Sequence, residues 1–340
     1  MIWSEGFTAS YYITIVDPAS WSDIGRMEIT AGNIDRSAED LLESADITMT
    51  ELPEGGEAWI RIWLDAEQNG VEHVPLFTGL TSAPSREING VRNTYDVECY
   101  SVLKPVNDIL TERGAYVPTE VVAPFAAARL LRTGIAPVEV ADIGDTPMPQ
   151  LTDAIIAEDG ETNLTLADKV LNAIGWRKRI DGEGTIHVEP DDDTTIQIFD
   201  AVDNDVIELS LTDEQDWYSC PNILRVISGD LTAIAMDTDP ESPLSTMARG
   251  REIWAEESSP SLGTNESIGA YANKKLRELQ SPARTITYAR RFDPSVRPGD
   301  VVWINHPEIG IDGRFRVDSQ SLELTYGCRT SETATAVKES

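Results

Sequence analysis

The residues in this 340-residue chain that could do chemistry are few and widely spaced. The three histidines, His73, His187 and His306, each precede a valine or a proline, and none has a partner at the spacing of a helical zinc motif. The sequence contains no nucleophile elbow, no P-loop and no glycine-rich dinucleotide loop. We therefore expect ordinary surface or core histidines.

The cysteines point the same way. Cys99, Cys220 and Cys328 are odd in number, far apart and without a CxxC pair, which argues against both a zinc site and a disulfide framework. Cys99 becomes a nucleophile only if the fold brings a histidine to it, and its strand context favours core packing. We expect reduced thiols, in a chain made and assembled in a cytoplasm.

Two acidic clusters offer the oxygen ligands that calcium prefers, Asp191-Asp192-Asp193 and Asp203-Asn204-Asp205. Neither has the twelve-residue loop that ends in a bidentate glutamate, so solvated loop charge is the favoured interpretation. A carboxylate pair for glycoside hydrolysis stays open, because among 59 acidic residues some pair always lies close. The sequence predicts no catalytic residue, no cofactor site and no metal site.

Two tryptophans four residues apart, Trp59 and Trp63, should face the same side of a regular strand. Such a pair can form a platform on which a sugar stacks, or it can pack inside a barrel and anchor a protein interface. We favour core and interface over carbohydrate.

The charge is the most unusual property of the sequence. Fifty-nine Asp and Glu against 27 Lys and Arg give a formal net charge of -32, which argues against sequence-specific nucleic-acid binding. Two interpretations stay open: a highly soluble surface, and a wall past which DNA slides without sticking. The start of the sequence has no signal-peptide pattern, and no uninterrupted apolar stretch predicts a membrane anchor.

The first hundred residues predict a small barrel or sandwich, because short runs alternate between polar and apolar residues or are rich in β-branched ones. A capping-box pattern at Ser37-Ala38-Glu39-Asp40 predicts one short helix among them. The expected strands are Tyr11–Val16, Asp46–Thr50, Ala58–Leu64, Val74–Leu80 and Thr94–Tyr100, with turns at Pro53–Gly56 and Asn89-Gly90.

The middle of the chain predicts helices. Pro124 suits the first turn of a helix that ends at Gly134, and Thr165 is placed to cap a second helix with an apolar stripe before Gly175. The turn Asp181–Gly184 then predicts a hairpin of Trp176–Ile180 with Thr185–Val188.

Strands return towards the C-terminal end, with one amphipathic helix of apolar residues spaced from Ile268 to Leu279. The residues from Arg329 to Ser340 are polar and are expected to be disordered. The expected strands are Val206–Leu211, Ile223–Ile227, Leu231–Ala235 (with a turn at Ser228-Gly229-Asp230), Thr285–Arg290, Val301–Asn305, Phe315–Asp318 and Ser321–Thr325.

The order of several stretches carries a resemblance. They are Gly32–Asp35 ahead of Asp46–Thr50, Phe77–Thr81 ahead of Tyr95–Leu103, Leu164–Leu171 with Gly175-Trp176 and Asp181-Gly182, Pro221–Val226, and Arg297–Ile304. In this order they resemble the hub proteins of phage tails and of related contractile injection systems, from about Ile13 to Leu324.

The resemblance implies a mainly β fold with an α+β insertion: two tube-forming β-barrel-like domains plus a smaller mixed α/β domain. The boundaries expected are 1–104 for the first barrel-like tube domain, 105–200 for the mixed α/β domain, 201–328 for the second β-rich tube domain with one helix and strands shared with earlier segments, and 329–340 for a flexible tail.

The function implied is that of a non-enzymatic structural virion protein, a ring-shaped hub at the distal end of a tail tube that connects tube to spike or tip. The implied partners are two further copies in a homotrimer, the tail tube protein, the distal tail protein, a spike or tip protein and the tape measure protein, with DNA passing through unbound. Assembly in the host cytoplasm and a place in the virion tail follow from that role.

Two alternatives stay open. One is a distal tail or adaptor protein, which shares the barrel chemistry but assembles as a hexameric ring. The other is a carbohydrate-binding protein or glycoside hydrolase built from β-strands. No enzymatic passenger domain is expected, because the sequence stops soon after the last predicted strand.

Overall fold

The computed structural model describes residues 1–39, 41–53, 56–89, 92–200, 207–208, 210–229, 231–258, 267–280 and 282–337. These residues form two compact units. The first holds Met1–Leu211 and Thr287–Ala334, and the second holds Thr212–Ile286 and the residues from Thr335 onward. Each unit is described by itself.

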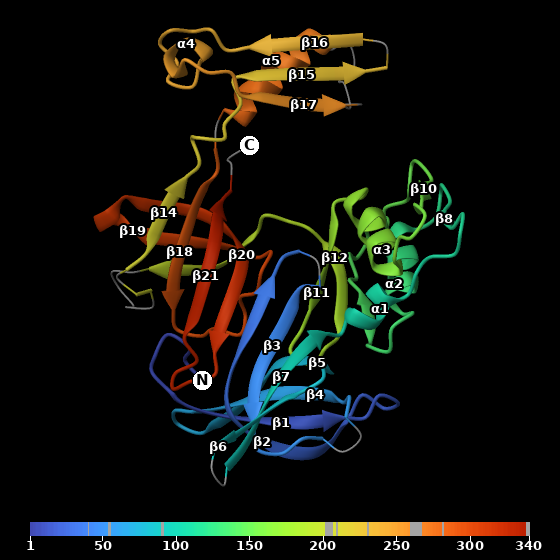
Figure 1. Ribbon diagram of the computed structural model, residues 1–340, viewed down its shortest axis with the longest axis vertical. Coiled ribbons are helices and arrows are strands. Elements are labelled where there is room, and N and C mark those ends of the chain that lie inside the picture. The colour runs from blue at the N-terminus through green and yellow to red at the C-terminus, as the bar shows by residue number, and fades with distance from the viewer. Residues whose placement is uncertain are drawn as a thin grey trace. The chain divides into compact units, whose positions relative to one another are not determined.

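Six strands of the first unit close into a ring, which we call the first barrel (Figure 1). Strand β1 pairs with β2 and with β4, β4 pairs with β5, β5 with β7, β7 with β3, and β3 with β2. The strands are β1 (Thr8–Val16), β2 (Asp23–Ser37), β3 (Glu43–Met49), β4 (Trp59–Glu67), β5 (Val71–Thr81) and β7 (Arg92–Ser101), and β6 (Ser85–Asn89) pairs with β7 outside the ring.

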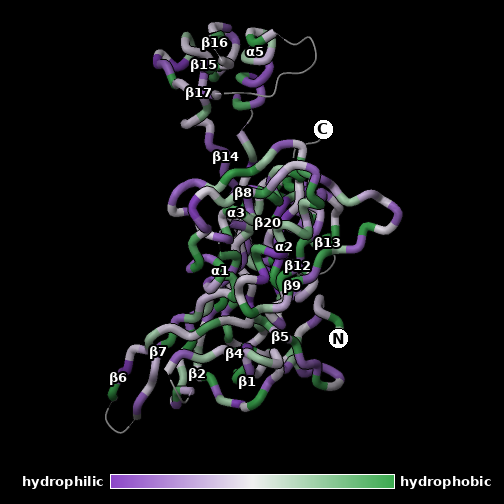
Figure 2. Tube along the Cα trace, turned by 90° about the vertical axis from the view of Figure 1, so that its right-hand side faces the viewer, coloured by the Kyte–Doolittle hydropathy of each residue, from purple (hydrophilic) through white to green (hydrophobic). Residues whose placement is uncertain are grey.

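Every second side chain along the strands points inward and fills the interior of this barrel. Along β4 the apolar Ile60, Ile62 and Leu64 alternate with Arg61, Trp63 and Asp65, and Figure 2 shows both hydrophobic and hydrophilic stretches among the strands of the barrel. Ile60, Ile62 and Leu64 are fully buried in the barrel core, whereas Arg61 and Trp63 lie on the other face of the strand. The period of two therefore separates an apolar interior from a polar outer surface.

A smaller region of helices and short strands packs beside the barrel (Figure 1). Its sheet places β12 between β11, to which it is antiparallel, and β9, to which it is parallel. The elements are α1 (Lys104–Asp108), β8 (Tyr116–Val117), α2 (Ala123–Leu131), β9 (Val138–Val140), β10 (Ile155–Ile156), α3 (Asn163–Asn172), β11 (Trp176–Ile180) and β12 (Ile186–Pro190).

The turn between β11 and β12 is bound to the first barrel. Thr78 Oγ1 donates to the carbonyl of Gly182 over 2.8 Å, and Arg61 Nη2 and Trp21 Nε1 donate to the carbonyl of Glu183. A Cβ at position 182 would lie 1.8 Å from the carbonyl oxygen of Pro75, so this close approach requires glycine.

The remaining strands of the first unit extend the sheet. Strand β20 pairs with β19 over its first half and with the end of β2 over its second half, and so joins both parts into one 13-stranded sheet. The strands added are β13 (Thr195–Asp200), β18 (Arg284–Arg290), β19 (Val301–His306), β20 (Ile311–Glu323) and β21 (Thr330–Ala336), with a 3₁₀ turn, η1, at Pro307–Ile309. Strand β14 (Thr212–Gln215) belongs to the second unit.

The second unit contains a three-stranded sheet in the order β16-β15-β17, with one helix on one face. Leu224, Val226 and Ala235 of the sheet pack against Ala272 and Leu276 of that helix. The elements are β15 (Ile223–Ser228), β16 (Leu231–Met236), the short helix α4 (Thr246–Arg249), β17 (Trp254–Ser258) and the long helix α5 (Ile268–Leu279).

The mainly β fold class is confirmed, and so are the three predicted helices, two in the middle of the chain (α2 and α3) and one near its C-terminal end (α5). The second of the middle helices begins earlier than expected: Thr162, not Thr165, is the N-cap, because its hydroxyl accepts from the amide of Thr165. The strands predicted at Phe315–Asp318 and Ser321–Thr325 form one long strand, β20.

Two predictions are wrong. Ser37 does not begin a helix, because it ends β2 and its hydroxyl accepts from the amide of Glu39 in a turn that leads to Leu42 at φ 65°. The disordered tail expected from residue 329 on is wrong for its described part, because Thr330–Ala336 form β21. Its side chains alternate as a half-buried strand requires, with Glu332 inside.

Some predictions fall on residues outside the described ranges. These are the calcium-like cluster Asp203-Asn204-Asp205, residues 206 and 209 of the strand Val206–Leu211, and parts of the turns at 53–56, 89–90 and 228–230. Among the described residues, no helix combines the length and hydropathy needed to cross a membrane.

The buried position of Glu332 generates a test. Substitution Glu332→Ala leaves the Arg290 guanidinium buried without its counter-charge, so we expect the free energy of unfolding to fall by about 3–5 kcal/mol. Thr333→Ala, on the solvent side of the same strand, should change it by no more than about 0.5 kcal/mol. Urea titration followed by tryptophan fluorescence measures both, and equal effects of the two substitutions would contradict the buried role.

Candidate functional site

A row of charged and amide side chains runs through the interior of the first unit, where the N-terminal and C-terminal strands meet. We call it the buried polar chain. Its members are less than a tenth exposed, and they come from β2, β3, β18, β20, β21 and the loop before β19. They are Arg36, Glu43, Arg290, Arg297, Gln320 and Glu332.

The chain is anchored by a bidentate ion pair. Arg290 donates from Nε and Nη2 to the two carboxylate oxygens of Glu332, over 2.9 and 2.6 Å, and both side chains are fully buried. Its guanidinium also lies 4.8 Å from the ring centre of Phe199. Burial opposes the charge on Arg290, but the Glu332 carboxylate outweighs burial and raises the pKa of the guanidinium.

Gln320 links this pair to the first barrel. Its Nε2 donates to Glu332 over 2.5 Å and to the carbonyl of Val296 over 2.9 Å. Its Oε1 accepts from Arg36 over 3.4 Å, and the two residues lie opposite each other in the β2–β20 ladder. Arg36 also donates to the carbonyl of Leu76 in β5.

The other end of the chain is less well satisfied. Glu43 Oε2 lies 3.8 Å from Arg36 Nε and 3.7 Å from Arg297 Nη1, so both are ion pairs without a direct hydrogen bond. Among the described residues, Arg36 Nε and Glu43 Oε1 have no hydrogen-bond partner. Burial raises the pKa of Glu43 to about 7 and lowers that of Arg36 to about 9.

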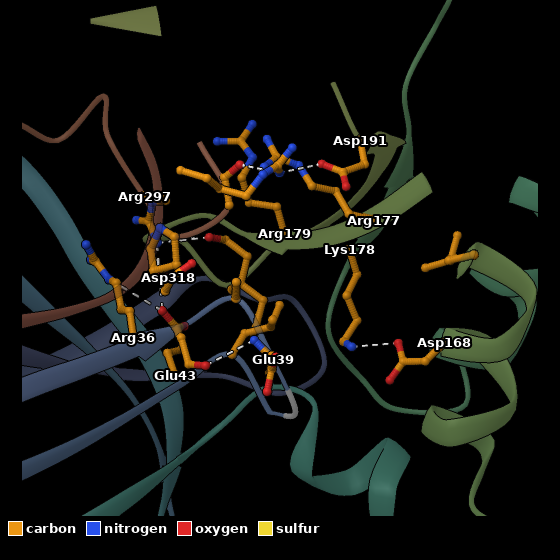
Figure 3. Close-up of a pocket in the computed structure, with 18 of the residues that line it drawn as sticks. Arg36, Glu39, Glu43, Asp168, Arg177, Lys178, Arg179, Asp191, Arg297 and Asp318 are labelled. Carbon is orange, nitrogen blue, oxygen red and sulfur yellow. Dashed lines mark hydrogen bonds and ion pairs between the residues drawn. The ribbon is translucent and has the colours of Figure 1, made fainter. Parts of the chain in front are cut away.

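This end opens into a pocket of about 650 Å³, bordered by the first barrel, α3, β11 and the loop before β19 (Figure 3). Its wall carries both signs of charge, and its cations are paired: Lys178 with Asp168, Arg177 with Asp300, and Arg316 with Asp191 and Asp193. The charged residues of the wall are Arg36, Glu39, Glu43, Asp168, Arg177, Lys178, Arg179, Asp191, Arg297, Arg316 and Asp318.

The hydrogen-bonded end of the buried polar chain, at Arg290 and Glu332, fastens segments together. A general acid or base needs a free proton position facing a substrate, whereas the Arg290–Glu332 pair is closed by direct hydrogen bonds. What these side chains do is hold β2, β3, β18, β20 and β21 in one register.

The three histidines lie in three different places. His73 is exposed and contacts Asp65 over 2.6 Å, and His306 is buried on β19 with neither ring nitrogen hydrogen-bonded among the described residues. His187 contacts Asp181 over 2.9 Å, and this contact raises the pKa of the histidine. Among the described residues, none of the histidines belongs to a cluster of three or more His, Cys, Asp or Glu side chains that could hold a metal ion.

The cysteines are buried thiols, as expected for core residues. Burial raises the pKa of Cys99 to about 12 and that of Cys328 to about 11, so neither is a thiolate at neutral pH. Cys220 is also buried, and its thiol contacts the carbonyl of Asp216.

Asp191 and Asp193 do not form a calcium loop. Both lie 2.6 Å from Arg316, on its Nη1 and Nη2, so one arginine offsets part of their negative charge. Asp192 caps the following turn by accepting from the amide of Thr194.

Trp59 and Trp63 share one face of β4 but have separate surroundings. Trp59 is buried against Trp21, with ring centres 5.4 Å apart. Trp63 stacks on Tyr12 at 6.3 Å and donates its indole N–H to Thr14. The two rings therefore do not form a joint sugar platform, in line with the packing role favoured from the sequence.

Sequence reasoning missed the buried polar chain. The sequence did contain one sign of it: Arg36 lies two residues after Ile34, so both side chains point into the barrel. The partners cannot be found in this way, since Arg36 and Gln320 are separated by 284 residues.

A second feature lies on the opposite face of the same strands, which we call the outer polar face. Along β7, β3 and β2 the outward residues include Glu98, Asp46 and Asp35, and Glu98 lies directly opposite Asp46 in the ladder. Burial, together with the charges of Glu98 and Asp35, raises the pKa of Asp46. Like charges placed opposite each other are destabilising, so packing alone does not favour this row.

The outer polar face continues along β20 and β21 with small hydroxyl side chains. Ser321 lies opposite Asp35, and Thr333 of β21 has its hydroxyl 3.3 Å from that of Thr287 in β18. Arg329, just before β21, is bound by Glu208 and Glu323, and Arg316 of β20 is bound by Asp191 and Asp193. The residues named on this face are therefore acids, hydroxyls and an arginine that is paired with acids.

Comparison with known proteins gives the fold. No protein-family model matches the sequence, and no curated protein matches it. Among solved structures, the tail protein from Neisseria meningitidis MC58 is similar with a TM-score of 0.65 and 16% identity over 97% of both chains. The 43 kDa tail protein of prophage MuSo2 from Shewanella oneidensis is similar with a TM-score of 0.65 and 13% identity over 96% of both.

A third structure extends the comparison. A component of the E. coli type VI secretion system, described as structurally similar to the T4 bacteriophage tail proteins gp27 and gp5, has a TM-score of 0.51 and 10% identity over 92% of this chain and 74% of that one. The chain thus shares its fold with phage tail proteins, as its motif order indicated.

The raised pKa of Glu43 generates a pH test. Because the folded state binds this proton more tightly than the unfolded chain does, the associated stability is fully present below about pH 4.5 and is lost as the pH rises through about 7. We expect the stability of the wild type relative to Glu43→Gln to fall by on the order of 3 kcal/mol between about pH 4.5 and about pH 8.

Urea titrations at several pH values measure this difference. Glu39→Gln, at an exposed position on the wall of the same pocket, is the control and should keep the wild-type profile. Parallel pH profiles for the wild type and Glu43→Gln would show that the carboxyl titrates alike in the folded and unfolded states.

Proposed function

We propose that this chain is a structural, non-enzymatic protein of a phage-type tail, which forms the ring-shaped hub at the distal end of the tail tube and connects the tube to a spike or tip. The observation that carries the proposal is the fold, which matches phage tail proteins along at least 96% of both chains in two structures. Two tube-forming β-domains per chain, bounded near 1–104 and 201–328, would place six around a ring of three copies.

The single sheet supports a role as part of a wall. The first barrel and the β18–β21 strands are joined by the β2–β20 ladder and by the buried polar chain beneath it. A wall that transmits load between tube and tip needs its two halves to move as one body, and a hydrogen-bonded sheet with buried ion pairs provides that.

The outer polar face supports a channel. Its acids repel the phosphates of passing DNA, and its hydroxyls offer no positive charge for DNA to bind. Like-charge pairs such as Asp46 and Glu98 reduce the stability of the fold, so folding does not explain their presence. A negatively charged molecule passing along this face does explain it. We infer that this face lines the lumen, with tape measure protein and then DNA as its contents.

The tube, distal tail and spike proteins are the neighbours that such a hub would contact. A chain of the Francisella PdpA–VgrG complex is similar with a TM-score of 0.56 at 7% identity, over 98% of this chain and 58% of that one. The location implied is the virion tail, with assembly in the host cytoplasm.

The number of subunits tests the proposal. Native mass spectrometry and negative-stain imaging of the purified chain, alone and with tail tube protein, should give a closed ring of three copies that binds the end of a tube. A ring of six would instead identify a distal tail or adaptor protein. A monomer that never joins tube protein, or binding on a glycan array, would overturn the hub.

The lumen assignment is tested by charge reversal. The triple variant Asp35→Lys, Asp46→Lys, Glu98→Lys converts the acid row into a basic track, and we expect it to bind duplex DNA at least tenfold more tightly than a matched variant does. The matched variant carries the same reversal on exposed acids of the α/β region, Asp142, Asp145 and Asp153.

Fluorescence anisotropy at low salt measures both affinities on the assembled protein, because the strength of phosphate contacts depends on salt. The wild type should bind no DNA. If the two triple variants bind equally well, the outer polar face is not a special DNA-facing surface and the lumen assignment fails.

A further inference from the structure

The three-stranded sheet of the second unit has an outer strand that is unusual in this chain. Strand β16 contains no charged residue, no proline and no glycine, in a protein with a net charge of -32. Three of its six side chains are large, apolar and exposed, namely Leu231, Ile234 and Met236.

These side chains do not belong to the core of the unit. Helix α5 covers the face that carries Leu224, Val226 and Ala235. Ile234 and Met236 point to the other face, beside Trp254, which is 51% exposed. The charged pair on that face, Arg225 with Glu256, is neutral as a whole.

Soluble proteins usually protect an edge strand with charges, prolines or bulges, because its unpaired backbone groups recruit other strands. The protein follows this rule elsewhere. Edge strand β14 carries Asp213 and Glu214, and β17, the other edge of the small sheet, carries Glu256 and Glu257. Strand β16 departs from the rule.

The backbone of β16 has groups available for a further strand. Ser228 lies opposite Leu231, so the turn has two residues and this closing pair is hydrogen-bonded. Alternate pairs are then hydrogen-bonded too, and the N–H and C=O groups of Thr232, Ile234 and Met236 point away from β15. Among the strands that the structure describes, none pairs with that edge.

We propose that β16 pairs with β17 of a second copy of this chain, which joins the small sheets of neighbouring subunits edge to edge. Strand β16 is antiparallel to β15, and β17 is parallel to it. Rotation about an axis along the strands therefore brings β16 of one copy antiparallel to β17 of the next. Each copy contributes one edge of each kind, so the contact is heterologous and can close into a ring.

Charge selects this pairing among the possible ones. Two β17 strands would bring Glu256 and Glu257 of one copy against those of the other, which is unfavourable. Against the uncharged β16 the same glutamates meet no like charge. Pairing of β16 with itself carries no charge penalty either, but it is twofold and would give a dimer instead of a ring.

The inference deepens the proposed hub and rests on it for the number of copies and for the choice of β17, rather than a second β16, as the partner strand. Cross-linking of the full-length chain tests the contact itself. The double variant Ile234→Cys, Ser258→Cys places one thiol on each edge, while the three native cysteines are buried. With a short bismaleimide we expect covalent trimers from the double variant and no covalent oligomer from either single variant.

The outcomes separate the contact from the hub. Covalent dimers of the single variant Ile234→Cys would show that β16 pairs with β16 and would overturn the β17 assignment. A ring of three in native mass spectrometry with no cross-link in the double variant would overturn the edge contact and leave the hub standing. A wild-type chain that stays monomeric would overturn both.

A charge substitution provides a second measurement. Ile234→Lys puts a cation on the uncharged edge and should weaken assembly at least tenfold, measured by mass photometry over a range of concentrations. Ile135→Lys alters another exposed isoleucine, in the turn after α2, and should leave assembly unchanged. Equal assembly of both variants would contradict the edge contact.

Discussion

The ladder between β2 and β20 is the constraint on which the first unit depends. It pairs residues 33–37 with residues 319–323 and so closes almost the whole chain into a loop. Closing so long a loop costs conformational entropy that five residue pairs do not repay alone. The contacts that the ladder brings together repay it: the first barrel on one side, β18, β19 and β21 on the other, and the buried polar chain beneath.

The buried charges explain why the ladder has one register. A buried ion pair adds little net stability compared with apolar residues of equal volume, but a register that leaves one partner unpaired is strongly disfavoured. A slip of one residue in β2 would turn Arg36 to the outer face and Asp35 inward, away from Gln320. The polar interior thus specifies the pairing that the hydrophobic pattern leaves open.

Local patterns in the sequence predicted local structure well. The apolar stripe of α3, the β11–β12 hairpin and the strands of β4 and β15 follow from the periodicity of their own residues. The first half of β2 escaped detection because most of its residues are exposed, so no apolar alternation marks it. β21 escaped because its buried positions hold Thr330, Glu332 and Ala334, and a glutamate is only credible inside once Arg290 is known to face it.

Local sequence patterns were also insufficient for the candidate site, because they do not show how the charged residues are distributed over the fold. The composition gives a formal net charge of -32 but does not show where on the structure the charges lie. In the fold, Arg36, Arg290 and Arg297 are buried, and Arg316 and Arg329 are bound by carboxylates. Since three of these cations are buried and the other two are paired with acids, they do not offset the outward carboxylates of β2, β3 and β7, namely Asp35, Asp46 and Glu98. A charge acquired only for solubility has no reason to place carboxylates opposite one another in a ladder, whereas a surface that must not hold DNA does.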